Sequence, residues 1–115
     1  MGLDTEPFCY VTTSGRVTGR EHTIEIWFAL QDRTMYLLSG GGDRSDWVRN
    51  VRRTPQVQVR VGDVRLSGRA RVVTDPDEDE LARRLVYEKY HRTYGGDLTS
   101  WRRSALPVAI DLESP

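Results

Sequence analysis

Two glycine-containing segments gather side chains that can bind an anionic or flat ligand. The first is SGRVTGR at residues 14–20, in which Gly15 and Gly19 permit a tight backbone turn. Its hydroxyl and guanidinium groups belong to Ser14, Arg16, Thr18 and Arg20. Forked arginine donors and exposed backbone amides suit a phosphate or a carboxylate. The GxxxxGKS/T pattern of a P-loop is absent, and an ordinary hairpin turn with solvated arginines is the alternative interpretation.

The second segment is SGGGDRSDWVRN at residues 39–50. Its first four residues let the backbone approach a flat or anionic ligand closely: Ser39, Gly40, Gly41 and Gly42. The segment leads into a predicted helix N-terminus, which favours anions. Trp47 can wall a planar ring, and Asn50 can hydrogen-bond the edge of a heterocycle. The alternative is a flexible loop in which Trp47 anchors the core.

A third group of aromatic residues lies near the C-terminal end. Tyr87, Tyr90 and Tyr94 follow helical spacing and are predicted to pack on one face. Tyr94 stands beside two glycines, so it is also the candidate for a lid and for a catalytic proton donor. His22 and Glu25 are three apart on a predicted strand. They therefore point to opposite faces, which argues against a joint acid–base pair.

Composition excludes several classes of protein. The chain has 115 residues, a length typical of one domain, here residues 1–115. The single cysteine, Cys9, and the two histidines offer no disulfide framework and no metal-ligand pattern. Zero net charge argues against a nucleic-acid binder. No apolar run is long enough for a membrane span, and the acidic N-terminus is unlike a signal peptide, so we expect a cytoplasmic protein.

Hydrophobic alternation and turn residues then predict the elements that hold these segments. Six strands and two helices are expected in the order β-turn-β-β-α-β-β-α-β. The strands cover residues 8–13, 21–30, 34–39, 56–61, 64–73 and 106–112, and the helices cover 45–53 and 74–90. Regular βαβ alternation is missing, so a mostly β (α+β) fold with an antiparallel sheet or small barrel is predicted. Gly68 marks a bulge or a barrel bend.

Four motifs in this order resemble a known family. They are TTSGRVTGR, LLSGGGDRSDWVRNV, TPQVQVRV and SALPVAIDL, within about residues 10–112. The chain resembles the deazaflavin-dependent nitroreductase family, a branch of the split β-barrel flavin and deazaflavin oxidoreductases. The resemblance implies a split β-barrel of about six antiparallel strands with two short helices. It also implies hydride transfer from a reduced deazaflavin, coenzyme F-420, to a small-molecule electron acceptor: a quinone, nitro compound or enone.

The resemblance assigns roles to the same residues. Arg16 and Arg20 would hold the cofactor phosphate or its acidic tail, residues 39–42 would approach the ring, and Trp47 with Asn50 would close the pocket. Val17 departs from the family, in which a lysine is common at this position. The alternatives are an FMN-binding split barrel of the pyridoxamine-phosphate-oxidase type, in which the flavin site lies between the subunits of a homodimer, and a non-catalytic flavin-binding or deazaflavin-binding protein.

Overall fold

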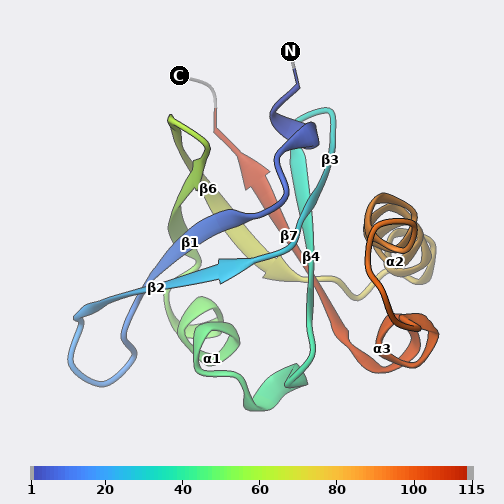
Figure 1. Cartoon of the computed structure of the whole chain (residues 1–115). Coiled ribbons are helices and arrows are strands. Elements are labelled where there is room, and N and C mark those ends of the chain that lie inside the picture. The colour runs from blue at the N-terminus through green and yellow to red at the C-terminus, as the bar shows by residue number, and fades with distance from the viewer. Residues whose placement is uncertain (1, 114–115) are drawn as a thin grey trace.

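Strands dominate the computed structural model, which describes residues 2–113 (Figure 1). Within this range there are seven strands and three α-helices, with short 3-10 turns at Leu3–Thr5 (η1) and Gly42–Arg44 (η2). The strands are β1 (Cys9–Ser14), β2 (Glu21–Ile26), β3 (Ala29–Gln31), β4 (Thr34–Ser39), β5 (Gln56–Val61), β6 (Val64–Val72) and β7 (Leu106–Leu112). The helices are α1 (Asp46–Arg53), α2 (Pro76–Tyr90) and α3 (Thr99–Ser104). The predicted mostly β fold is confirmed.

The strands form one curled antiparallel sheet in the order β2-β1-β5-β6-β7-β4-β3. Around Gly68, β6 passes from its partner β5 to its partner β7: Gly68 pairs with Val57 on one side and with Leu112 on the other. A Cβ atom at Gly68 would lie 2.7 Å from the carbonyl oxygen of Asp111, so the close approach of β7 requires glycine. The pairing register stays regular on both sides. Gly68 is therefore a barrel bend without a bulge, and the split β-barrel is confirmed.

Two hydrophobic cores lie on the two faces of this sheet. The alternating valines of β5 point into the barrel, where they meet Trp47, Val48 and Val51 of α1. The second core lies between the sheet and α2, and includes Val86 and Tyr90. Figure 1 shows α1 at one end of the barrel, and α2 with α3 along one side. The loops that adjoin α1 and those that adjoin α2 and α3 therefore lie at different places around the barrel.

The predicted strand over residues 21–30 is in fact interrupted. It separates into β2 and β3 at Trp27 and Phe28, which makes seven strands instead of six. The backbone N–H of Phe28 donates to the Tyr90 hydroxyl at 3.1 Å, and its carbonyl accepts from Lys89 Nζ at 2.9 Å. Because side chains of α2 hydrogen-bond the N–H and C=O of Phe28, these two groups do not pair with a neighbouring strand. A third helix, α3, is present in addition to the two that were predicted.

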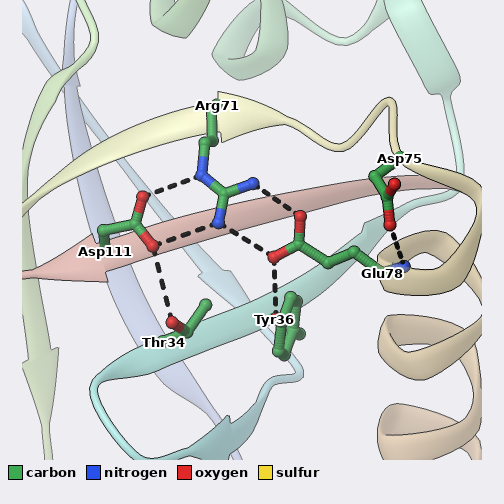
Figure 2. Close-up of polar contacts among 6 residues, drawn as sticks. All are labelled: Thr34, Tyr36, Arg71, Asp75, Glu78 and Asp111. Carbon is green, nitrogen blue, oxygen red and sulfur yellow. Dashed lines mark hydrogen bonds and ion pairs between the residues drawn. The ribbon is translucent and has the colours of Figure 1, made fainter.

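A polar network joins α2 to three strands (Figure 2). The Arg71 guanidinium donates to Glu78 Oε1 at 2.7 Å and to Asp111 Oδ2 at 2.7 Å. Hydrogen bonds from Arg71 hold the pKa of both carboxyls below their usual values. Tyr36 donates to Glu78 Oε2 at 2.8 Å, and burial, followed by this bond, raises its pKa to about 12. Asp75 caps α2, because its carboxylate accepts from the Glu78 amide.

No helix among residues 2–113 is both long and apolar enough to cross a bilayer.

Candidate functional site

The arginine loop between β1 and β2 is held by its own backbone. The Gly15 amide donates to the Arg20 carbonyl at 2.7 Å, and the Gly19 amide donates to the Gly15 carbonyl at 2.9 Å. Gly19 has φ +78°, a left-handed conformation that favours glycine. The Thr18 hydroxyl accepts from the Arg20 amide at 3.3 Å. The predicted tight turn is confirmed, and it presents the arginines without a helix behind it.

Asn50 fixes this loop to α1. Its side chain is only 2% exposed, and its Oδ1 accepts from the backbone N–H of Arg16 at 3.1 Å and from Arg16 Nη1 at 3.0 Å. Its Nδ2 donates to the hydroxyl of Thr13, also buried, at 3.0 Å. All these partners belong to the protein, so the amide positions Arg16. Sequence reasoning expected Asn50 in the site but did not predict this contact.

A second partner of Arg16 is acidic. Arg16 Nη2 lies 3.2 Å from Asp46 Oδ1, and the Asp46 side chain is 83% exposed. An ion pair this exposed is weak and easily replaced by another anion. An anionic ligand can therefore displace Asp46 from the Arg16 guanidinium.

These residues line a cavity of about 550 Å³, here called the arginine cavity. Arg16, Thr18 and Arg20 face it from the loop, and Asn50 and Trp47 face it from α1. Ser14 lies half-buried at the end of β1 and is not among the lining residues. His22 also lines the cavity, and a Cβ atom on Gly15 would lie 3.0 Å from its Nε2. The donor set of the arginine cavity is that of an anion site.

The glycine turn after β4 is shaped by two serines. The buried Ser39 hydroxyl lies 2.9 Å from the Ser45 hydroxyl and donates to the Gly42 carbonyl at 3.3 Å. A Cβ atom on Gly41 would collide with Ser45 Oγ, and Gly42 has φ +59°. Ser45 occupies the N-cap position of α1, but its hydroxyl serves the turn and makes no capping bond. The backbone conformation therefore favours glycine at Gly42, whereas a side chain at Gly41 would require the Ser45 hydroxyl to rotate away.

Beside this turn lies a second cavity of about 560 Å³, here called the aromatic cavity. Ser39, Gly40 and Trp47 line one side of it. Its other lining residues come from the β2–β3 break and from the segment around α3: Trp27, Tyr94, Asp97, Leu98 and Trp101 among them. A flat apolar ring can pack against aromatic side chains of this kind.

The aromatic walls are packed against one another. Trp27 stacks on Tyr90 with ring centroids 4.2 Å apart and an interplanar angle of 5°. Tyr94 and Trp101 meet Trp27 edge-on at 5.5 and 5.7 Å. Of the three tyrosines predicted to share one face, Tyr90 is buried, Tyr87 is half-buried, and Tyr94 remains 47% exposed. Tyr94 is therefore accessible to a ligand.

Sequence reasoning missed Trp27 as a site residue. It placed Trp27 on a continuous strand, and the break that turns it into the aromatic cavity depends on Tyr90, 62 residues away from Phe28. Trp101 was not predicted as a site residue either. The sequence feature that could have indicated it is the group of aromatic residues near the C-terminal end, which Trp101 follows. Glu25 lines the aromatic cavity, but its carboxylate accepts from Tyr10 at 3.1 Å.

The two cavities meet at Trp47, which lines both of them. One end of this combined surface offers guanidinium and hydroxyl donors, and the other offers flat aromatic walls beside a glycine turn. A ligand with an anionic tail and a planar ring fits this arrangement.

Comparison with known proteins identifies the family. A family model described as F-420H(2)-dependent quinone reductase matches residues 2–113. The chain therefore belongs to this family. It is a deazaflavin-dependent oxidoreductase, and its cofactor is coenzyme F-420. No curated protein matches the sequence.

Solved structures share the fold at low sequence identity. A conserved hypothetical protein from Mycobacterium tuberculosis is 21% identical, with 97% of this chain and 76% of that one covered and a TM-score of 0.76. A structure described as an F-420-H2 dependent reductase (FDR-A) is 22% identical, with coverages of 93% and 94% and a TM-score of 0.73. A structure described as a domain-swapped dimer is 24% identical, with coverages of 93% and 80% and a TM-score of 0.73.

Proposed function

We propose that the protein passes a hydride from reduced coenzyme F-420 to a quinone, with nitro compounds and enones as further acceptors. The observation that carries this proposal is the junction of the arginine cavity with the aromatic cavity at Trp47. The coenzyme has a flat deazaflavin ring and an acidic, phosphate-bearing tail. A site for it therefore needs apolar walls at one end and anion donors at the other.

The proposed roles follow the chemistry of each residue. Arg16 and Arg20 bind the acidic tail by charge-assisted hydrogen bonds, with the hydroxyl of Thr18 beside them. Ser14, which does not line the cavity, supports the start of the loop. The backbone of residues 39–42 approaches the ring, because glycine leaves room there. Trp47 walls the ring, and Asn50 holds Arg16 in place.

When bound, the reduced coenzyme supplies the hydride, and the protein positions and shields the reactants. Quinone reduction needs one hydride and one proton, which together give the hydroquinone. The Tyr94 phenol lines the aromatic cavity and can donate that proton to the acceptor oxygen. Because the side chain is 47% exposed, solvent can return the proton to it.

An anaerobic assay tests the proposal. Purified protein is mixed with reduced coenzyme F-420 and a water-soluble quinone, nitro compound or enone, and reoxidation of the coenzyme is followed by absorbance. We expect turnover that requires the protein and is fastest with the quinone. Tyr94→Phe should lower kcat and leave the coenzyme dissociation constant unchanged. Coenzyme binding without turnover of any acceptor would favour a carrier protein, and tighter binding of FMN would favour a flavin enzyme.

The assembly is a separate proposal. A homodimer is supported by the similar structure described as a domain-swapped dimer. Sedimentation velocity tests it, with twice the mass of the 13.2 kDa chain as the expected result and the mass of one chain as the contradicting one.

A further inference from the structure

The charged groups of the aromatic cavity are all of one sign. They belong to Glu25, near the end of β2, and to Asp97, just before α3. No lysine or arginine among residues 2–113 lines this cavity. The arginine cavity has the opposite balance, with Arg16 and Arg20 against Asp46. The two halves of the combined site therefore differ in the sign of their charge.

Both carboxylates are available to a ligand. Asp97 Oδ1 accepts from the Thr99 amide at 2.9 Å and from the Thr99 hydroxyl at 2.8 Å, and these bonds hold the pKa of Asp97 below its usual value. Glu25 Oε1 accepts from the Tyr10 hydroxyl at 3.1 Å. Within the part of the chain that the structure describes, neither carboxylate forms an ion pair. Their negative charge is therefore not balanced by a neighbouring cation.

The aromatic rings of the cavity act in the same direction. The indoles of Trp27, Trp47 and Trp101 line it together with the phenol of Tyr94. The face of an aromatic ring attracts a cation, and indole does so most strongly. Indole rings and carboxylates together are surroundings in which a quaternary ammonium group is stabilised. An anionic group at the same place would be repelled by the carboxylates.

The neighbouring arginines do not reverse this preference once the coenzyme is bound. In the proposed complex, the acidic tail pairs with Arg16 and Arg20 and balances their charge. The carboxylates of Glu25 and Asp97 then dominate the electrostatic potential that a second reactant meets in the aromatic cavity.

We propose that the aromatic cavity selects electron acceptors by charge, and that it binds a planar acceptor with a cationic substituent in preference to an anionic acceptor with the same ring. The inference rests on the proposed quinone reduction and adds the charge of the acceptor. Glu25 and Asp97 attract the cationic substituent, and the indole rings contact both this substituent and the acceptor ring.

The test compares three quinones that share one ring and a short alkyl chain, which ends in a trimethylammonium, a hydroxyl or a sulfonate group. Dissociation constants are measured by quenching of tryptophan fluorescence with oxidised coenzyme F-420 present, and KM is measured with the reduced coenzyme. We expect the ammonium compound to bind roughly tenfold more tightly than the sulfonate, with the hydroxyl compound between them and a difference that shrinks as salt rises. Equal dissociation constants, or tighter binding of the sulfonate, would overturn the proposal.

Amide variants remove each charge and keep an oxygen that can accept the existing hydrogen bonds. We expect Asp97→Asn and Glu25→Gln each to reduce the preference for ammonium over sulfonate a few-fold, and the double variant to remove most of it. The matched control is Asp63→Asn, because Asp63 is an exposed carboxylate that lines neither cavity, and this variant should keep the preference. Partial unfolding affects all three quinones alike, so it leaves the preference unchanged. A preference that persists in the double variant, or that falls equally in Asp63→Asn, would contradict the proposal.

The two proposals fail differently. If none of the three quinones is reduced, quinone reduction is wrong, while the dissociation constants still decide whether the cavity selects by charge. If all three are reduced and bound equally well, quinone reduction stands and the selection by charge is wrong.

Discussion

Arg16 and Arg71 both join a helix to the sheet, but their partners differ. Arg71 bonds two carboxylates, Glu78 and Asp111, each through two hydrogen bonds. Arg16 bonds the neutral amide of Asn50 and a single exposed carboxylate, Asp46. The Arg71 side chain is thus neutralised within the protein, whereas the charge of Arg16 is only weakly compensated.

This difference separates a structural arginine from the arginine that we propose binds the coenzyme. The Arg71 network joins α2 to β4, β6 and β7, and the guanidinium makes four hydrogen bonds to carboxylates within it (Figure 2). Arg16 is positioned by a buried neutral group, which holds it in place without cancelling its charge. We therefore expect substitutions at Arg16 to alter binding and substitutions in the Arg71 network to alter stability.

The largest effect is expected at Asn50, because this side chain is buried and also positions Arg16. Asn50→Leu removes an amide that is 2% exposed and leaves the Thr13 hydroxyl and the Arg16 amide without their partner. We expect a loss of about 2–3 kcal/mol in the free energy of unfolding, measured in urea, together with weaker coenzyme binding. Gln58→Leu, on the exposed face of β5, is the control and should change stability by less than about 0.5 kcal/mol. Equal losses in the two variants would contradict the role given to Asn50.

If Arg16 binds the coenzyme as proposed, removing its side chain should lower the affinity for the coenzyme and leave stability little changed. Arg16→Ala is expected to weaken coenzyme F-420 binding at least tenfold, about 1.4 kcal/mol, and to flatten its salt dependence. Fluorescence titration at two salt concentrations measures both. The control is Arg65→Ala, because Arg65 is exposed and lines neither the arginine cavity nor the aromatic cavity. Unchanged affinity in Arg16→Ala would show that the loop does not bind the tail.

The Arg71 network should give a pH-dependent stability. The pKa values of Glu78 and Asp111 are lowered in the folded state, so their contribution is present above their ordinary pKa values. It is lost as the pH falls below about 5 towards the lowered values. Glu78→Gln should therefore cost about 1 kcal/mol at pH 7 and reduce the acid-side slope, as measured by urea unfolding across pH. Coenzyme affinity at pH 7 should stay the same; if it falls instead, the two regions are not separate.

The smallest effect on coenzyme affinity is expected at Asp46, whose carboxylate pairs with Arg16 and competes with an anionic ligand. Asp46→Asn removes the carboxylate that faces Arg16 Nη2 at 3.2 Å. We expect coenzyme F-420 to bind a few-fold more tightly, because one negative charge no longer competes with the acidic tail. The comparison variant is Asp43→Asn, which removes a carboxylate from the Arg52 ion pair outside the arginine cavity. Weaker binding in Asp46→Asn would mean that Asp46 takes part in the site itself.

The parts of the fold that could be predicted are those whose signal is local. The alternation of Val57, Val59 and Val61 predicts β5 and its buried face. The glycine segments predicted both turns, because a left-handed backbone conformation at Gly19 or Gly42 favours that residue type.

The parts that could not be predicted depend on contacts distant in the sequence. The break at Phe28 exists because Tyr90 and Lys89 of α2 take its backbone groups. The contact of Arg16 with Asn50 spans 34 residues, and no spacing rule relates the two positions. The family resemblance placed both residues at one site, while the structure explains why the amide is needed there.

The central claim is that one cofactor spans the arginine cavity and the aromatic cavity across Trp47. The most direct measurement is a fluorescence titration of the wild-type protein with coenzyme F-420 and with the same deazaflavin ring lacking the phosphate-bearing tail. The account predicts saturable binding of both, with the complete coenzyme bound at least tenfold more tightly and the advantage shrinking as salt rises. Equal affinity for the two compounds, or an advantage that salt does not change, would contradict it.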